Sequence, residues 1–265
     1  MSSSRPIGLF DSGVGGLSVM KEIRRLLPAE DLLYFGDSAH CPYGTKTASF
    51  IRERALAISR FLLSRGVKLI VVASNTTSIA ALDYIRPLVG VPVVGMEPAV
   101  KPATTATRNR RVGVLATGVT LAGERFSSLL ERFGNGTAIY TMPCPGLVEL
   151  VESGSWEGPQ AEALLHRYLD GLLAQGVDTV VLGCTHYPFL RPLVEKMVGK
   201  EVRVIDTGEA VARQVQRVLE GGELFDPGAD RGREYFYTSA DPREVERVMR
   251  RLWGEDYLVV ERISL

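Results

Sequence analysis

The stretch Val71-Val-Ala-Ser-Asn-Thr76 has a counterpart 110 residues further along the chain, at Val181-Leu-Gly-Cys-Thr-His186. Both are apolar runs that pass into a small residue, then into Ser or Cys, and then into polar groups. A second pair, Ile7–Val14 and Val112–Val119, repeats at an offset of 105 residues. The similar offsets predict two α/β halves of like topology. The alternative is that α/β strands in general end in small residues followed by Ser or Thr.

Short β-rich apolar runs alternate along the chain with longer segments whose apolar residues recur at helical spacing. One such segment has apolar residues at positions 50, 55, 58 and 62 and ends on Gly66, a residue typical of a helix C-terminus. The alternation predicts an α/β fold with mostly parallel sheets covered on both faces. The expected strands are Ile7–Phe10, Leu32–Phe35, Lys68–Ala73, Pro92–Met96, Val112–Ala116, Ala138–Thr141, Thr179–Leu182 and Val202–Ile205.

The two halves are expected to be pseudo-symmetric, with a site at their interface. The expected division is residues 1–97 with 208–265 for the first half and 98–207 for the second. Ligands in such folds lie beyond the carboxyl ends of the strands. Ser74 and Cys184 are therefore expected to approach a shared cleft from opposite sides. The strand ends expected to line it are Phe10, Phe35, Ala73, Ala116 and Gly183.

Composition excludes several classes of protein. The chain has 265 residues, 45% of them apolar, with 31 basic against 31 acidic residues, so nucleic acid is disfavoured as the main ligand. Three cysteines without a CxxC pair exclude a disulfide framework and a Cys-rich zinc site. The N-terminus lacks the pattern of a signal peptide, and the apolar runs are too short to span a bilayer. We expect a cytoplasmic protein.

The loop Phe10-Asp-Ser-Gly-Val-Gly-Gly-Leu17 follows the first strand and opens a helix. Its glycines expose amides that suit a carboxylate or phosphate. It is not the dinucleotide fingerprint, because Ser18 stands where a third glycine is required, and the chain has no P-loop. The alternative is a tight turn with Asp11 or Ser12 as helix N-cap.

Two further loops end at the same edge of the sheet. The segment Ser74-Asn-Thr-Thr-Ser78 forms a polar cup for a carboxylate or an ammonium, or else is an ordinary N-cap. No G-x-S-x-G surrounds Ser74, which disfavours a hydrolase nucleophile. In the loop from residue 36 to 44, Tyr43 could cover a ligand and Gly44 could offer an amide, whereas Cys41 is interpreted as a bystander thiol.

Cys184 is the strongest candidate for a reactive side chain. It follows a buried strand at a helix N-terminus, with His186 two residues later, a setting that lowers a thiol pKa. Cys184 and His186 could also ligate a metal, but no pattern supplies a third ligand. A buried inert cysteine is the alternative. Glu152 lies on a short apolar helix from which it could reach the cleft.

Five motifs in order resemble the glutamate racemases of the aspartate/glutamate racemase superfamily. They are "IGLFDSGVGGLSV", "YFGDSAHCPYGTK", "ASNTTS", "LGCTHYP" and "DTGEAVA", and the similarity runs from Pro6 to about Met249. The resemblance implies an enzyme that supplies D-glutamate for peptidoglycan without cofactor or metal. It also implies two pseudo-symmetric halves, a homodimer, and a catalytic cysteine from each half.

Residue roles follow from the same resemblance. Cys184 would be one catalytic thiol, and Asp11, Glu152 and His186 would tune the bases. Glutamate would be held by Asp11, Ser12, Tyr43, Gly44, Asn75, Thr76, Thr117, Thr120, Thr185 and His186. The family has a second catalytic Cys in its "A-C-N-T" motif, and this chain has Ser74 there.

The hydroxyl of Ser74 is a much weaker acid than the thiol it replaces. A thiol has a pKa of about 8.5, and the pKa of an alkyl hydroxyl should lie near that of bulk water, far above the range of a thiol. The difference corresponds to about 10 kcal/mol as an upper bound. We therefore expect a chain that binds glutamate and racemises it poorly. Two alternatives stay open: a one-cysteine decarboxylase of the same superfamily, and an inactive glutamate-binding variant.

Overall fold

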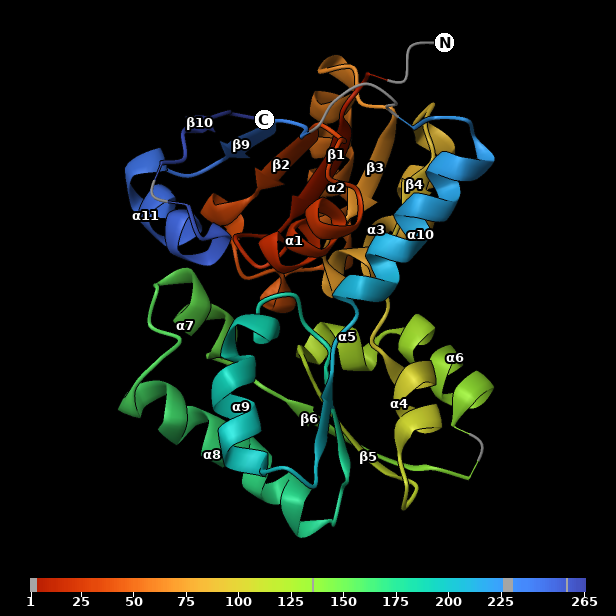
Figure 1. Ribbon diagram of the computed structural model, residues 1–265, viewed down its shortest axis with the longest axis vertical. Coiled ribbons are helices and arrows are strands. Elements are labelled where there is room, and N and C mark those ends of the chain that lie inside the picture. Colours follow the sequence, from red (N-terminus) through yellow and green to blue (C-terminus); the bar gives the residue numbers. More distant parts are fainter. Residues whose placement is uncertain (1–3, 135, 226–230, 256) are drawn as a thin grey trace.

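The structure is a computed structural model that describes residues 4–134, 136–225, 231–255 and 257–265. Its strands form two parallel sheets, one in each half of the molecule (Figure 1). The expected α/β class with parallel sheets is thus confirmed. The first sheet takes its strands from residues 7–94 and 234–262, so the C-terminal segment returns to lie beside the N-terminal strands. The second takes its strands from residues 111–205.

The six-stranded sheet has the order β10-β9-β2-β1-β3-β4. Its strands are β1 (Ile7–Asp11), β2 (Leu32–Gly36), β3 (Leu69–Val72), β4 (Val93–Val94), β9 (Glu234–Thr238) and β10 (Val260–Arg262). The four-stranded sheet has the order β6-β5-β7-β8. Its strands are β5 (Arg111–Ala116), β6 (Ala138–Pro143), β7 (Thr179–Leu182) and β8 (Arg203–Ile205).

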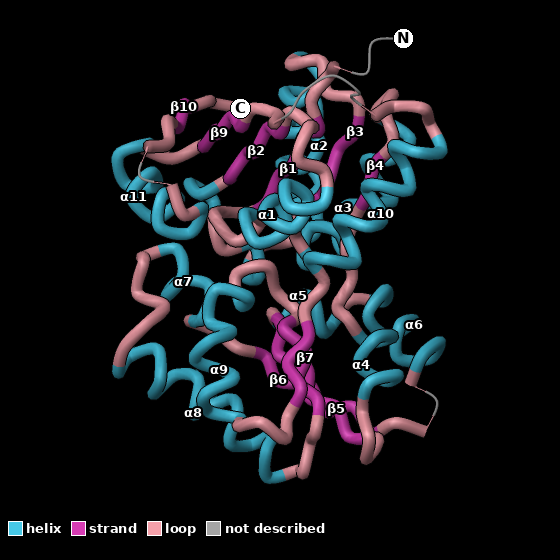
Figure 2. Tube along the Cα trace, in the orientation of Figure 1, coloured by secondary structure: helices cyan, strands magenta, loops and turns pink. Residues whose placement is uncertain are grey.

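Helices cover both faces of each sheet (Figure 2). The helices of the first half are α1 (Leu17–Leu26), α2 (Ala48–Ser64), α3 (Asn75–Ile85), α10 (Gly208–Gly221) and α11 (Pro242–Trp253). Those of the second half are α4 (Val100–Ala106), α5 (Gly118–Ala122), α6 (Glu124–Phe133), α7 (Leu147–Glu152), α8 (Pro159–Ala174) and α9 (Arg191–Val198). None of them, within the described part of the chain, combines the length and apolar character needed to cross a membrane.

The side chains of β1 point alternately to the two faces of the sheet, which explains why helices cover both faces. Ile7 and Leu9 belong to the core shared with α1, α10 and α11, whereas Phe10 packs into the core under α2 and α3. Helix α2 buries Ile51, Ala55, Ile58 and Leu62 and is followed by Gly66, whose φ of +78° allows the chain to leave the helix.

All eight expected strands are present, and the structure adds β9 and β10. The expectation missed these two because β10 carries two charged residues and β9 begins with Glu234, so neither is an apolar run. Strand β4 is limited to Val93–Val94, shorter than the expected Pro92–Met96. Pro92 has no N–H to give to a ladder, which is consistent with a short strand at the sheet edge.

Candidate active site

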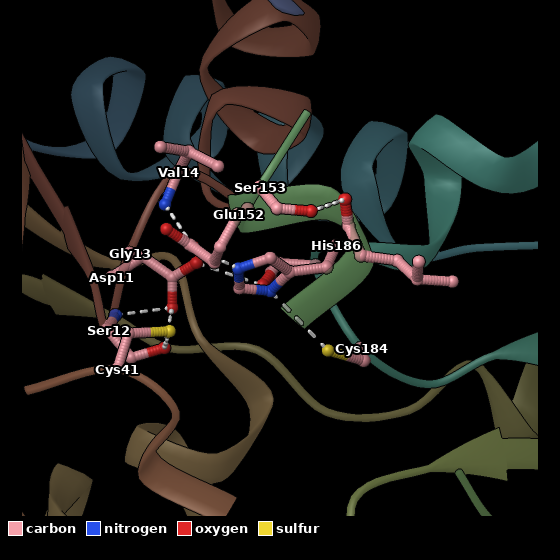
Figure 3. Close-up of polar contacts among 12 residues, drawn as sticks. Asp11, Ser12, Gly13, Val14, Cys41, Glu152, Ser153, Cys184 and His186 are labelled. Atoms are coloured by element: carbon pink, nitrogen blue, oxygen red, sulfur yellow. Dashed lines mark hydrogen bonds and ion pairs between the residues drawn. The ribbon is translucent and has the colours of Figure 1, made fainter. Parts of the chain in front are cut away.

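Asp11 joins the two halves at the carboxyl end of β1 (Figure 3). Its side chain is 1% exposed, and its Oδ2 accepts a 3.0 Å hydrogen bond from Oγ1 of Thr185, which lies just beyond β7. Its Oδ1 accepts a 2.6 Å hydrogen bond from the backbone N–H of Ser12. The side chain of Ser74 lies near enough to Asp11 to lower the pKa of its carboxyl. Asp11 therefore lies close to the strand end that carries Ser74 and hydrogen bonds to the segment that carries Cys184.

His186 lies between an acid and a thiol. Its Nε2 is 2.6 Å from Oε1 of Glu152, and its Nδ1 is 3.7 Å from the sulfur of Cys184. The imidazole is 1% exposed, and Cys184 is 7% exposed. Glu152 ends helix α7, so a separate element orients the ring. The Cys184 thiol, the His186 ring and the orienting Glu152 carboxylate thus form a row in space, which suits proton transfer at the sulfur.

The glycines after β1 provide space for this arrangement. A Cβ on Gly13 would lie 1.9 Å from Oε1 of Glu152, and one on Gly15 would lie 2.3 Å from Nδ1 of His186. The backbone N–H of Val14 donates a 2.7 Å hydrogen bond to Oε1 of Glu152. The sequence predicts that the exposed amides bind a carboxylate or phosphate, and in the structure this amide is bound to a carboxylate of the protein itself.

Burial and charge shift the acidities of the central groups. Burial raises the pKa of the Asp11 carboxyl, against the opposing effects of the His186 charge and of several hydrogen bonds. Burial by itself lowers the pKa of His186, but its contacts with Cys184, Cys41 and Glu152 raise it well above the ordinary value. These contacts therefore favour the protonated form of the His186 ring.

Ser74 and Asn75 lie at the N-terminus of helix α3, which follows β3. The Ser74 hydroxyl accepts hydrogen bonds from the backbone N–H and the hydroxyl of Thr77, at 3.3 and 2.9 Å. Ser74 is therefore the N-cap of α3, which is the alternative interpretation of this segment in the sequence. Asn75 is 2% exposed, and neither polar atom of its amide has a hydrogen-bond partner among the described residues. A buried amide of this kind is suited to bind a ligand.

Three threonines close the site between the halves. Oγ1 of Thr76 lies 3.0 Å from that of Thr117 and 3.3 Å from that of Thr120, while Thr117 and Thr120 are 3.0 Å apart. Next to them is a cavity of about 240 Å³. Its lining includes Gly44, Thr117, Cys144 and Glu149, from both halves. Three of the four threonines named from the sequence therefore meet, and one of them, Thr117, lines the cavity.

The loop after β2 is fixed from behind by a buried acid. Asp37 is 0% exposed, accepts hydrogen bonds of 2.9 and 2.8 Å from Arg54, and also accepts one from the Tyr43 hydroxyl. Tyr43 is 1% exposed and its hydroxyl is bound to Asp37, so this hydroxyl helps to hold the loop, and the expectation that Tyr43 covers a ligand stays a prediction. Gly44 packs against Thr117, where an added Cβ would approach to 3.2 Å.

Cys41, interpreted from the sequence as a bystander thiol, lies beside the residues of the candidate site. Its sulfur lies 4.0 Å from Oγ of Ser12 and within 4.8 Å of a ring nitrogen of His186. Burial, followed by the charge of Glu152, raises its pKa to about 12. Its place immediately before Pro42, in the same loop as Tyr43, was the available signal. The other two histidines lie apart: His40 contacts Asp37, and His166 pairs with Asp170 on the surface of α8.

Residues 7–215 match the family model described as Asp/Glu/Hydantoin racemase. The chain belongs to this family. A glutamate racemase from Pseudomonas paraeruginosa (strain PA7) is 54% identical over 254 residues, which are 96% of each chain. A glutamate racemase from Pseudomonas putida (strain KT2440) is 53% identical over 251 residues, 94% of each chain. The family membership inferred from the motifs is confirmed, and the protein is an isomerase of the racemase class.

Two solved structures share the whole fold of this racemase. The Thermus thermophilus glutamate racemase, in complex with beta-chloro-D-alanine, has a TM-score of 0.84 and 41% identity, and the match covers 100% of this chain and 99% of that one. The Escherichia coli glutamate racemase, in complex with L-glutamate and the activator UDP-MurNAc-ala, has a TM-score of 0.88 and 36% identity, with 98% of each chain covered.

The two candidate acid–base residues, Cys184 and Ser74, have unlike surroundings. On one side, Cys184 has a histidine and a carboxylate behind it. On the other, Ser74 has Asp11 and a helix N-terminus behind it. A thiol can take and return a proton near neutral pH, whereas an alkyl hydroxyl can donate a hydrogen bond but is a poor base. The two sides therefore differ in the proton transfers they can support.

Proposed function

We propose that this racemase interconverts L- and D-glutamate by proton transfer at Cα, with Cys184 as one acid–base group and Ser74 in the position of the other. The observation that carries the proposal is the contact of His186 with both Cys184 and Glu152. This contact gives the Cys184 thiol, as the base, two orienting groups at the end of β7. The relatives named glutamate racemase, at 54% and 53% identity, support glutamate as the substrate.

The proposed route removes the Cα proton on one face and returns a proton on the other. Cys184, as thiolate, takes the proton from L-glutamate, while the proton on His186 stabilises the negative sulfur. Ser74 then reprotonates the opposite face, directly or through a water. That second step is slow, because the alkoxide left on Ser74 lies about 10 kcal/mol above the corresponding thiolate as an upper bound.

Glutamate would bind through the polar groups around these two residues. The side chain of Asn75, unpartnered and buried, and the threonine hydroxyls beside the cavity suit carboxylates. Asp11 is an acceptor suited to the ammonium. Two residues are proposed to contact the substrate through their backbone, Tyr43 and Gly44. The other residues proposed to contact it are Asp11, Ser12, Asn75, Thr76, Thr117, Thr120, Thr185 and His186.

The two proposed halves of the molecule are residues 1–97 with 208–265, and residues 98–207.

The deciding experiment is exchange of the Cα hydrogen in D₂O, run separately from L- and D-glutamate, on this chain and on Ser74→Cys. We expect deuterium uptake mainly from L-glutamate in the unaltered chain and from both enantiomers in Ser74→Cys. No exchange from either enantiomer in Ser74→Cys, in a folded protein, would contradict the proposal.

A glutamate-binding protein without turnover is the second candidate, because the Ser74 hydroxyl is occupied with Thr77. Measurable glutamate affinity in calorimetry, with no Cα exchange from either enantiomer, would favour it. The polar side chains around Asp11 argue against the apolar substrates of a one-cysteine decarboxylase.

The proposal extends to assembly and compartment. By resemblance to the family we propose a homodimer, which a sedimentation mass of two chains would support. Three free cysteines fit a reducing cytoplasm.

A further inference from the structure

Cys41, Glu152 and His186 present three metal-ligand atoms at one point. A sulfur, a carboxylate oxygen and an imidazole nitrogen lie within 4.8 Å of one another. The three residues come from the loop after β2, the end of α7 and the segment after β7. Cys41 has no part in the proton transfers proposed above. Figure 3 draws the Cys184 sulfur and the Glu152 carboxylate at different ring nitrogens of His186.

We propose that Cys41, Glu152 and His186 form a binding site for a thiophilic divalent cation, Zn²⁺ or Cd²⁺, whose occupancy inhibits the enzyme. Zinc takes thiolate, neutral imidazole and carboxylate ligands, with an open fourth position for water, so binding releases the protons of the Cys41 thiol and the His186 ring to solvent. Metal–ligand distances of about 2.0–2.3 Å need donor atoms about 3.2–3.7 Å apart in a tetrahedron. The cluster approaches this spacing with shifts of the order of 1 Å.

The surroundings of the cluster favour a cation. Asp11 adds a second carboxylate through Ser12, which contacts both Asp11 and Cys41. Among the described residues, no hydrogen bond or ion pair joins Cys41, Glu152 or His186 to a lysine or arginine. The backbone of Val14 orients the Glu152 carboxylate, as the outer partners of metal ligands commonly do.

Occupancy would remove the groups that support Cys184. A metal bound to Nε2 separates this nitrogen from Glu152, now 2.6 Å away, and holds the ring with its Nδ1 toward the Cys184 sulfur. The imidazole can then no longer exchange a proton with the carboxylate. Metal binding itself does not depend on the proposed racemisation, whereas the inhibition does, so the two are measured separately.

The binding test titrates the purified full chain with Cd²⁺ and follows the ultraviolet sulfur-to-cadmium absorption band. We expect saturation at one ion per chain and displacement by Zn²⁺. The band is expected to disappear in Cys41→Ser and in Cys41→Ala, and Glu152→Gln should weaken binding at least about 10-fold. Cys144→Ser is the matched control, because Cys144 is a buried cysteine whose sulfur donates to Met142 O outside the cluster.

A band that persists in Cys41→Ser, or is lost in Cys184→Ser alone, would overturn the proposal. Near-ultraviolet circular dichroism checks that each variant is folded.

Alkylation of the unaltered chain gives a test without substitutions. Saturating Zn²⁺ should slow modification of Cys41, and an unchanged rate overturns the proposal. In the Ser74→Cys background, Zn²⁺ should inhibit Cα exchange reversibly on chelation, and the additional change Cys41→Ser should raise the inhibitory concentration at least about 10-fold.

Discussion

Nε2 of His186 lies 2.6 Å from Oε1 of Glu152, although the two residues belong to different elements of the second half. The pair is deeply placed, with side-chain exposures of 2% for His186 and 19% for Glu152. Because the same ring reaches Cys184 through Nδ1, Glu152 sets both the position and the proton of the imidazole.

Ser74→Cys should raise racemisation by at least about 100-fold, since a positioned acid–base group contributes about 10²–10⁴ in rate. The added change Cys184→Ser should abolish it. Circular dichroism of mixtures that start from each enantiomer measures the inversion. Equal rates from L- and D-glutamate at full turnover, with Ser74 in place, would show that two thiols are not required.

Glu152→Gln, in the Ser74→Cys background, should lower kcat more than it raises KM. The amide keeps the size of the side chain but removes the charge that pairs with His186. We expect a loss of about 10- to 100-fold in kcat, as for other groups that orient a functional side chain. Glu131→Gln, an exposed change on α6, is the control and should leave both constants unchanged. A pure KM effect would assign Glu152 to substrate binding.

His186 should stay protonated at neutral pH, because its contacts with Cys184, Cys41 and Glu152 raise its pKa despite burial. A raised folded-state pKa stabilises the protein fully below the unfolded value of about 6.5, and this stability is lost as the pH rises through the folded pKa. Nitrogen-15 spectra of the three histidines, followed with pH, measure the effect. A neutral His186 at pH 7 would contradict it.

Asp37→Asn should lower the free energy of unfolding by about 3–5 kcal/mol, because it breaks a buried ion pair with Arg54. Asp83→Asn is the control, since Asp83 is 73% exposed in its pair with Arg86 and should change stability by about 0–1 kcal/mol. Urea unfolding measures both. A loss for Asp37→Asn no larger than the control would remove Asp37 as the support of the Tyr43 loop.

The acid limb of stability should also depend on Asp37. Burial alone would raise its pKa, but hydrogen bonds from Arg54 and Tyr43 hold it below the usual 3.8. A depressed pKa contributes stability above pH 3.8 that is lost as the pH falls through the folded value. The difference in unfolding free energy between the unaltered chain and Asp37→Asn should therefore shrink below about pH 4.

Gly15→Ala should displace His186, because the new methyl would lie 2.3 Å from Nδ1. A misplacement of about 1 Å can reduce a rate about 100-fold, so Cα exchange through Cys184 should fall by that order. Gly221→Ala is the control, since a Cβ there meets no atom within 4 Å. Exchange that survives Gly15→Ala unchanged would show that His186 need not keep this position.

The sequence by itself determined the α/β class, the eight apolar strands, and the family. Strand–helix alternation is a local property, and parallel strands bring their carboxyl ends to one edge of a sheet, so the order of the residues places Asp11 and Ser74 at one edge of the first sheet and Cys184 at the corresponding edge of the second. That Ser74 stands where the family has a thiol, and that this slows racemisation, are predictions made from the sequence by resemblance, which the exchange experiment tests.

Only the tertiary structure decided which side chains meet. The contact of Glu152 with His186 depends on how α7 packs over the loop after β1, and the steric need for Gly13 and Gly15 follows from that packing. Cys41, interpreted from the sequence as a bystander, proved to lie against the same histidine. Such contacts join segments far apart in the chain, and residue spacing carries no information on them until the two halves are packed together.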